Sequence, residues 1–338
     1  MDIREAIGKL VNRDDLSETD TVSVMNQIMT GGATPIQVSS FLTALRMKGE
    51  TVHEITGAAR VMREKAHRVK VNADCIFDTC GTGGDQKGTL NVSTTAAFVV
   101  ASSGIPVAKH GNRSVSSRSG SADVLAALGV KIDIPRERVE ECLEKIGIGF
   151  LFAPLLHEAM KYAVQPRREI GIRTIFNLLG PLTNPAGATH QLLGIYDGEL
   201  TSLIANVLKN LGTVRAMVVH GLEGLDEISL CGATKVSELR DGKVRDYTLS
   251  PEEYGFKQCR LEDLQGGSPE ECAAILKEIL RGEKGPKRDV VLLNSGAALY
   301  VSGKVDSIAQ GVRLAAESID SGKAQEKLDQ LVQMTNAG

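Results

Sequence analysis

Apolar residues recur at helical spacing over the first 70 residues and predict four short helices. Ile3, Ala6 and Leu10 mark the first helix, which carries polar residues on its other face. The stretches Thr34–Gln37 and Thr51–Glu54 each combine an N-cap threonine with a Gln or Glu three residues later, which indicates a helix start. Four helices with short connections predict an all-α unit.

The pattern changes near residue 75, where short apolar runs begin to alternate with helical stretches. Strands are expected at residues 75–78, 105–109, 130–132, 149–152, 191–196 and 214–219. Helices are expected at residues 92–103, 122–128, 136–146, 199–211, 269–281, 306–321 and 324–334. Residues 226–256 are expected to form short strands. This alternation predicts a mostly parallel central sheet flanked by helices.

The fold class is therefore α/β, with a small helical domain and a larger α/β domain. We place the helical domain at residues 1–70 and expect helices within about 157–189 to complete it. The α/β domain then spans residues 71–338.

Composition narrows the possible functions. The chain has 338 residues, 42% of them hydrophobic and 24% charged, which is typical of a globular protein of about two domains. A formal net charge of −3 gives no basic excess, so we expect no nucleic-acid partner. Six scattered cysteines form no CxxC pair, and no apolar run is long enough for a membrane span. We expect a cytoplasmic protein with reduced thiols and no membrane partner.

The first candidate site is the glycine-rich stretch GTGGD at residues 81–85, directly after a predicted strand. Glycines let backbone N–H groups approach phosphate oxygens, and the stretch NVST at 91–94 begins a helix whose N-terminus favours anions. The spacing matches neither a Walker loop nor GxGxxG. A tight structural turn is the alternative, but the hydroxyl groups of the following helix start favour phosphate binding.

The second candidate is the stretch KHGNRSVSS at residues 109–117, which follows the next predicted strand. Lys109 and Arg113 supply positive charge, while Asn112 and the serines supply neutral donors. Such a group suits a polyanion such as a diphosphate, and a solvated basic loop is the alternative. His110 has no Ser or Cys nucleophile paired with it, so a structural role is the simpler interpretation.

Two further candidates come later in the chain. The adjacent carboxylates of Asp226 and Glu227 follow a predicted strand and suit Mg²⁺, although such a pair is more often solvated surface. An arginine of the stretch 167–173, close to the proline-containing stretch 178–185, suits a carboxylate held against an apolar ring. For the arginines, spacing alone favours a helix end with exposed side chains.

Together these segments resemble the anthranilate phosphoribosyltransferase family. The motifs that carry the resemblance are GTGGD, NVST, KHGNRSVSS, SGSADVLAALG (119–129), RTIFNLLGPLTNPA (173–186) and HGLEGLDEIS (220–229). They occur in family order, and the resemblance extends over essentially the whole chain. It implies transfer of a 5-phosphoribosyl group from 5-phosphoribosyl 1-diphosphate to the amine of anthranilate, in tryptophan biosynthesis. It also implies a homodimer formed through the helical domain.

The resemblance assigns site residues as well. It implies diphosphate–sugar contacts at Gly81, Gly84, Asp85, Thr89, Asn91, Val92, Ser93, Thr94, Lys109, His110, Gly111, Asn112, Arg113, Ser114, Val115, Ser116, Ser117 and Ser121. It implies magnesium ligands, for two ions, at Ser93, Asp226 and Glu227. It implies anthranilate contacts at Gly81, Asn112, Arg167 and Pro181, where counting back from Phe176 favours Arg167 over Arg168.

No catalytic acid or base stands out, which agrees with a reaction driven by positioning and electrostatics. Two alternatives remain at this stage. One is a pyrimidine nucleoside phosphorylase-like enzyme of the same architecture, which the acidic pair and the stretch 173–186 disfavour. The other is a non-catalytic nucleic-acid-binding relative, which the net charge disfavours.

Overall fold

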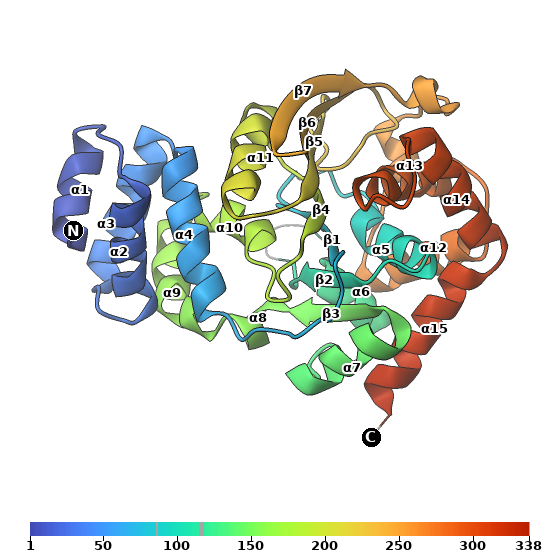
Figure 1. The fold of residues 1–338 in the computed structure, drawn as a ribbon, viewed down its shortest axis with the longest axis horizontal. Helices are drawn as coiled ribbons and strands as arrows, with labels where there is room; N and C mark the ends of the chain where they lie inside the picture. Colours follow the sequence, from blue (N-terminus) through green and yellow to red (C-terminus); the bar gives the residue numbers. More distant parts are fainter. Residues whose placement is uncertain (86, 115–117, 338) are drawn as a thin grey trace.

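The computed structural model describes residues 1–85, 87–114 and 118–337. Four helices form one end of the molecule (Figure 1): α1 (Ile3–Val11), α2 (Glu18–Met29), α3 (Pro35–Lys48) and α4 (Val52–Lys65). The two predicted capping boxes are confirmed. The Thr34 side chain accepts from the Gln37 N–H, and the Thr51 side chain accepts from the Glu54 N–H.

Two later helices pack against this N-terminal group (Figure 1). Helix α9 (Lys161–Ile170) contacts α2 and α3, and helix α10 (Phe176–Leu182) contacts α4. Their apolar side chains belong to the same buried cluster as those of α1–α4. This packing supports the prediction that helices within 157–189 complete the helical domain, whose boundaries remain a prediction.

A seven-stranded sheet forms the centre of the rest of the molecule. Its order is β3-β2-β1-β4-β5-β6-β7. The first five strands are parallel, and β6 and β7 are antiparallel. The strands are β1 (Phe77–Gly81), β2 (Val107–Gly111), β3 (Ile148–Phe152), β4 (His190–Gly194), β5 (Arg215–Gly221), β6 (Thr234–Arg240) and β7 (Lys243–Leu249). The predicted mostly parallel sheet and the β excursion are both confirmed.

The two faces of the sheet have separate apolar cores. Helix α5 (Val92–Ser102) follows β1 and shares a buried cluster with Leu192 of β4, whereas α11 (Thr201–Asn210) shares the other cluster with Leu193. Successive side chains of a strand point to opposite faces, so α5 and α11 cover opposite faces of the sheet. The strand order thus reverses between β1 and β4, and α/β proteins bind ligands at the carboxyl ends of strands beside such a point.

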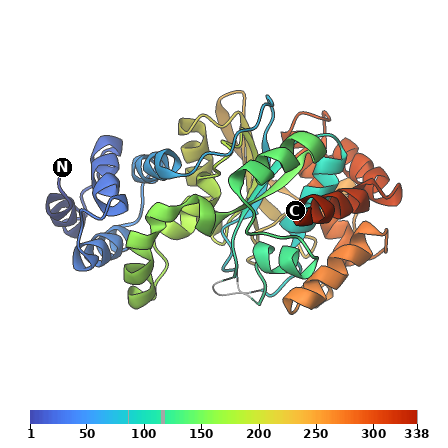
Figure 2. The same cartoon turned by 90° about the horizontal axis from the view of Figure 1, so that it is seen from below.

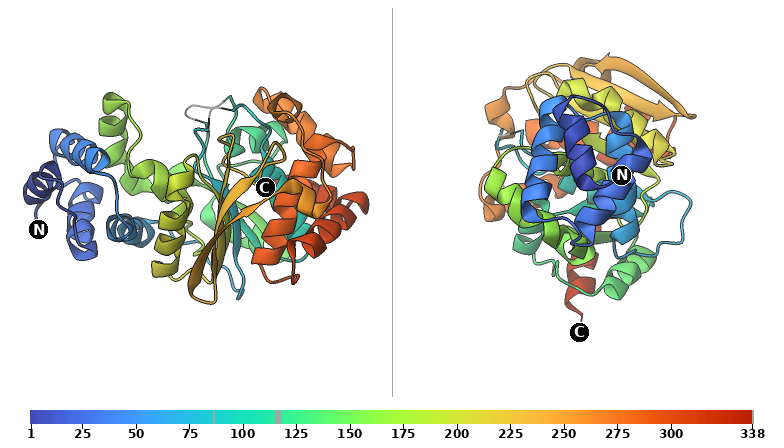
Figure 3. Two further views of the ribbon diagram at one scale, coloured as in Figure 1. Left: turned by 90° about the horizontal axis from the view of Figure 1, so that it is seen from above. Right: turned by 90° about the vertical axis from the view of Figure 1, so that its left-hand side faces the viewer.

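The remaining helices complete the layers around the sheet (Figures 2 and 3). Helices α13 (Pro286–Val301) and α15 (Lys323–Asn336) pack on α5. The others are α6 (Ser121–Ala127), α7 (Arg136–Ile146), α8 (Ala153–Leu156), α12 (Pro269–Leu280) and α14 (Ile308–Asp320), with short 3₁₀ turns at Glu158–Met160, Gly198–Leu200, Pro251–Tyr254 and Leu261–Leu264.

Two predictions about these elements are wrong. Residues 130–132 form no strand: Val130 and Ile132 are buried, but the Lys131 N–H donates to Thr335 of α15 instead of to a sheet. Helix α13 is missing from the prediction, because 12 of its 16 residues are buried and no polar face marks its period.

Within the described chain no helix has the length and apolar character needed to cross a bilayer.

Candidate active site

The predicted glycine-rich loop lies at the carboxyl end of β1, beside the point where the strand order reverses. The Thr82 N–H donates to the Gly194 carbonyl of β4 at 2.9 Å, and the Gly83 N–H donates to Asp226 Oδ2 at 2.8 Å. Gly84 has a φ of +76°, a left-handed conformation that favours glycine. Hydrogen bonds of its own main-chain N–H groups therefore fix this loop.

Asp226 approaches the ends of β1 and β4 closely because glycine allows it to. A Cβ atom at Gly194 would overlap the main-chain carbonyl of Asp226. Glu227, the next residue, accepts a hydrogen bond from the Ser93 N–H at 3.1 Å, in the first turn of α5. The acidic pair thus joins the loop after β5 to both the glycine-rich loop and the α5 N-terminus.

The ionised forms of the two carboxylates are unfavourable here, and the nearby charge of Lys109 opposes this only in part for Glu227. Burial, and then the charge of Asp85, raise the pKa of Asp226 to about 7. Burial, and then the charge of Asp226, raise the pKa of Glu227 well above its usual value. A bound cation would relieve both effects.

The chemistry of this donor set fits magnesium. Within the residues that the structure describes, no group of three or more His, Cys, Asp or Glu side chains could hold a metal ion. Mg²⁺, however, is usually bound by one or two carboxylates plus substrate phosphates and water. Asp226 and Glu227, with Ser93 bonded through its N–H to Glu227, are compatible with such a partial ligand set, and their role as magnesium ligands stays a prediction.

Lys109 supplies positive charge at the same edge of the sheet. It lies on β2, is only 4% exposed, and its Nζ donates to the Thr79 carbonyl at 2.6 Å and to Ser93 Oγ at 3.4 Å. Burial lowers the pKa of Lys109, and the negative charge of Asp78 opposes that shift. The contacts hold this ammonium group beside the start of α5, where an anion is favoured.

The second predicted loop is held by an aspartate that sequence analysis did not single out. Asp123 accepts hydrogen bonds from the Ser114 and Gly120 N–H groups at 2.9 and 3.0 Å and from Arg113 at 2.9 Å. Its position three residues after the helix N-cap is the signal that would have indicated it. The predicted residues Val115, Ser116 and Ser117 lie outside the described part of the chain.

Several other residues predicted to contact the diphosphate make hydrogen bonds to neighbouring main-chain segments. Asn91 donates to the Ser119 carbonyl, Ser121 donates to the Asn112 carbonyl, and Thr89 forms a β-bridge with Gln265. Val92 and Thr94 are both buried, and the apolar Val92 side chain leaves only its main chain to meet a polar ligand. The Thr94 hydroxyl has no hydrogen-bond partner within the described residues.

His110 connects this region to helix α10. Its Nδ1 lies 3.1 Å from the Gly180 carbonyl, so Nδ1 carries the proton. Burial lowers the pKa of His110 to about 3, which keeps the ring neutral. The contact brings Gly180, and the buried Pro181 that follows it, next to the loop that contains Gly111 and Asn112.

Of the two neighbouring arginines considered for contact with anthranilate, one is partly buried and the other is exposed. Arg167 is partly buried, with its guanidinium carbon 5.2 Å from the Phe176 ring centroid, and burial lowers its pKa. Arg168 is exposed. This agrees with the choice of Arg167, whose contact with anthranilate stays a prediction.

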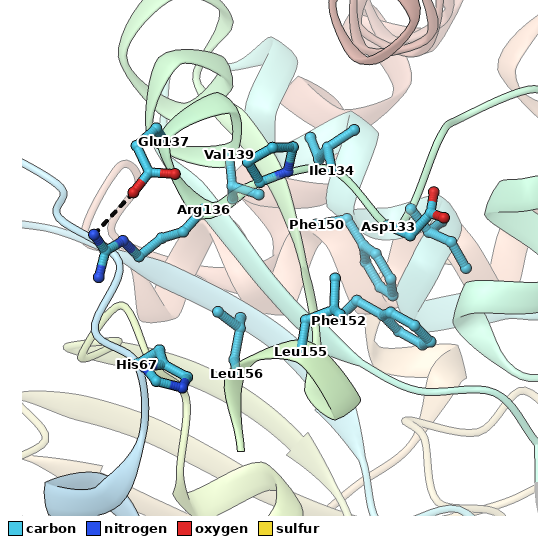
Figure 4. A pocket seen from close by; sticks show the side chains of 12 residues that line it. His67, Asp133, Ile134, Arg136, Glu137, Val139, Phe150, Phe152, Leu155 and Leu156 are labelled. Atoms are coloured by element: carbon cyan, nitrogen blue, oxygen red, sulfur yellow. Dashed lines mark hydrogen bonds and ion pairs between the residues drawn. The ribbon is translucent and has the colours of Figure 1, made fainter. Parts of the chain in front are cut away.

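A separate cavity of about 390 Å³ lies beside the edge strand β3 (Figure 4). Phe150, Phe152, Leu155 and Leu156 give it an apolar wall, and Arg136 pairs with Glu137 at its rim. Of the predicted substrate and metal residues that the structure describes, none lines this cavity. The candidate site is instead formed by loops at the strand ends.

Comparison with known families agrees with this architecture. The family model described as the helical bundle domain of a glycosyl transferase family matches residues 4–66, and the model of its a/b domain matches residues 73–325. The fold and these matches define the chain as a glycosyl transferase with a helical bundle and an α/β domain.

The relatives define the particular branch of that class. Anthranilate phosphoribosyltransferase of Acetivibrio thermocellus is 58% identical over 335 residues, covering 99% of this chain and 97% of the relative. The solved structure of the enzyme from Thermus thermophilus is 46% identical with a TM-score of 0.94, covering 98% of this chain and 99% of that one. The chain belongs to the anthranilate phosphoribosyltransferase family.

A third comparison bears on ligands. The structure of anthranilate phosphoribosyltransferase from Saccharomyces cerevisiae in complex with PRPP and Mg is 30% identical with a TM-score of 0.90. It covers 98% of this chain and 97% of that one.

Proposed function

We propose that this protein transfers the 5-phosphoribosyl group from 5-phosphoribosyl 1-diphosphate to the amine of anthranilate, in tryptophan biosynthesis. The observation that carries the proposal is the position of Asp226 and Glu227. They contact the glycine-rich loop and the α5 N-terminus at the point where the strand order reverses. The names and ligands of the relatives supply the substrates.

In this reaction the anthranilate nitrogen forms a bond to C1 of the ribose, the C1–O bond to diphosphate breaks, and the amine loses a proton. The arylamine has a usable lone pair, so the site needs to position and stabilise rather than to supply a strong base. Lys109 would bind the diphosphate oxygens, and the positive N-terminal end of the α5 dipole would favour the same anion. The absence of side chains at Gly83 and Gly84 would let the loop main chain approach the same ligand, while the Gly83 N–H stays bonded to Asp226.

Asp226, Glu227 and Ser93 would hold the magnesium, and we propose two ions. When bound, magnesium neutralises the leaving diphosphate. Charge develops on the ribose ring in displacements of this type, so the fixed carboxylates and dipoles of the site would stabilise it without rearrangement.

One assay tests the proposal. The protein is mixed with phosphoribosyl diphosphate, Mg²⁺ and anthranilate, and the loss of anthranilate fluorescence is followed. Loss that requires all three components is the expected result. No loss with or without the metal would overturn the proposed function, and phosphorolysis of thymidine in its place would indicate the phosphorylase alternative.

Replacing Arg167 by alanine is expected to raise the KM for anthranilate about tenfold, because a charge-assisted contact with the carboxylate is lost. The KM for phosphoribosyl diphosphate should change less than about twofold. Steady-state kinetics with each substrate varied in turn measures both, and Arg168→Ala is the matched control because Arg168 is exposed on the same helix. An unchanged KM for anthranilate would remove Arg167 from its site.

We also propose a homodimer formed through the helical domain. Exposed apolar side chains gather on the helices at that end of the molecule: Val11 on α1, Ile36 and Met47 on α3, and Tyr162 and Val164 on α9. Helix α3 contacts both α1 and α9, so the three helices are neighbours. Large exposed apolar side chains on neighbouring helices are what an interaction surface would bury.

Sedimentation velocity measures the oligomeric state. The chain should sediment as a dimer of 36.1 kDa protomers, and Ile36→Asp with Met47→Asp should shift it toward the monomer. Dimers that persist in this double variant would contradict the proposed surface.

We place the enzyme in the cytoplasm. All six cysteines are free in the structure: Cys75, Cys80, Cys142, Cys231, Cys259 and Cys272. Thiols without disulfides fit a reducing compartment.

A further inference from the structure

Arg173 lies where the helical layer meets the glycine-rich loop. It belongs to the connection between α9 and α10, the two helices that pack against the N-terminal group (Figure 1). Its guanidinium group donates a hydrogen bond to the Gly84 carbonyl, and its Cζ lies 4.1 Å from the Tyr196 ring centroid. The motif RTIFNLLGPLTNPA includes this arginine, but its pattern assigns the side chain no role.

The guanidinium group occupies the space left by the missing side chain of Gly84. A Cβ atom at Gly84 would lie 3.2 Å from Arg173 Nη2 and 3.6 Å from Cζ. Arg173 is therefore packed between the glycine main chain on one side and the Tyr196 ring on the other. A guanidinium group is suited to this position, since it is planar, stacks on aromatic rings and donates in a fixed direction.

The aromatic side of this arrangement is anchored to the same loop. The Tyr196 N–H donates to Thr82 Oγ1 at 3.1 Å, and the Thr82 N–H donates to the Gly194 carbonyl at 2.9 Å. Arg173, Tyr196 and the loop residues Thr82 and Gly84 thus form a closed ring of contacts.

The loop has three successive main-chain anchors after β1. Thr82 is held by β4, Gly83 by the Asp226 carboxylate, and Gly84 by Arg173. Glycine loses more conformational freedom on ordering than other residues, so a loop of this composition depends on such anchors. Of these three anchors, the third is the one made by a cationic side chain.

We propose that Arg173 is a positioning residue for the phosphoribosyl diphosphate site. It fixes the Gly84 carbonyl, and through it the Gly83 N–H that meets Asp226, without needing to touch substrate. This inference rests on the proposed function. It also assigns different substrates to two arginines of one short segment. Arg167 would contact anthranilate, and Arg173 would position the loop that binds the sugar diphosphate.

Calorimetric titration of the full-length protein with phosphoribosyl diphosphate and Mg²⁺ tests the proposal without requiring turnover. Arg173→Ala is expected to raise the Kd about tenfold, the effect of losing one hydrogen bond from a charged group. In steady-state kinetics its KM for anthranilate should change less than about twofold, the reverse of the pattern expected for Arg167→Ala. Arg168→Ala is the exposed control and should leave the Kd unchanged.

Tyr196 variants test the ring of contacts itself. Tyr196→Phe keeps the aromatic face and should bind like the wild type, whereas Tyr196→Ala should weaken binding as Arg173→Ala does. Because the two residues act as one unit, the double variant should be only slightly weaker than either alone.

Three results would overturn the proposal: an unchanged Kd in Arg173→Ala, an equal rise in Kd and in the anthranilate KM, or full additivity in the double variant. Failure of the proposed function looks different. A wild type that binds phosphoribosyl diphosphate but never consumes anthranilate would disprove the reaction, while the binding comparison would still decide the role of Arg173.

Discussion

The Asp226→Asn variant is expected to retain about 1% or less of the wild-type kcat/KM for phosphoribosyl diphosphate, because it removes a negative charge from the proposed metal site. The asparagine Oδ1 can still accept the hydrogen bond that Asp226 Oδ2 receives from the Gly83 N–H. The loop can therefore keep its position while the ligand charge is lost. Titration with Mg²⁺ should show that more metal is needed for half-maximal activity.

The matched control for this variant is Asp241→Asn. Asp241 is exposed in the turn between β6 and β7 and has a φ of +51°, a conformation that asparagine tolerates. The same loss of charge there should leave kcat/KM unchanged. If Asp226→Asn kept more than about half of the wild-type activity at limiting Mg²⁺, Asp226 would not be a metal ligand.

The parts of the fold that sequence patterns predicted are those decided locally. A capping threonine with Gln or Glu three residues later marks the starts of α3 and α4, and alternating strands and helices indicate the parallel sheet. Helix α13 is the counterexample. It is surrounded by other elements, so its composition carries no period to detect, and only tertiary packing identifies it.

In the candidate site too, sequence patterns predicted some features and could not predict others. Residues at the carboxyl ends of β1 and β2 could be predicted to lie together, since parallel strands end at a common edge. The roles of Arg173 and Gly194 could not, because each depends on a segment distant in sequence: Arg173 on Gly84, and Gly194 on the backbone of Asp226. A motif shows which residues are present but not which of them hold the others in place.

Replacing Lys109 by methionine is expected to lower kcat/KM about 100-fold, because this ammonium group would lie beside the diphosphate. It should also lower the free energy of unfolding by about 3 kcal/mol, since it leaves the buried charge of Asp78 without the opposing charge of Lys109. Urea unfolding and steady-state kinetics measure the two effects separately. A loss of stability alone, however, can lower activity by reducing the amount of folded protein.

The Lys48→Met variant distinguishes a direct role of Lys109 in the reaction from an indirect loss of activity through lower stability. The Lys48 side chain is only 4% exposed and pairs at 3.0 Å with Glu54, which is completely buried, so this variant also leaves a buried carboxylate without its cation. It lies in α3, in the helical domain, and should lose a similar free energy of unfolding while keeping its activity per folded molecule. If Lys109→Met lost no more activity than Lys48→Met, the role of Lys109 would be structural. A large difference at equal stability would show that the Lys109 ammonium group acts on the substrate, because both variants remove a buried ammonium group but only Lys109 lies at the proposed site.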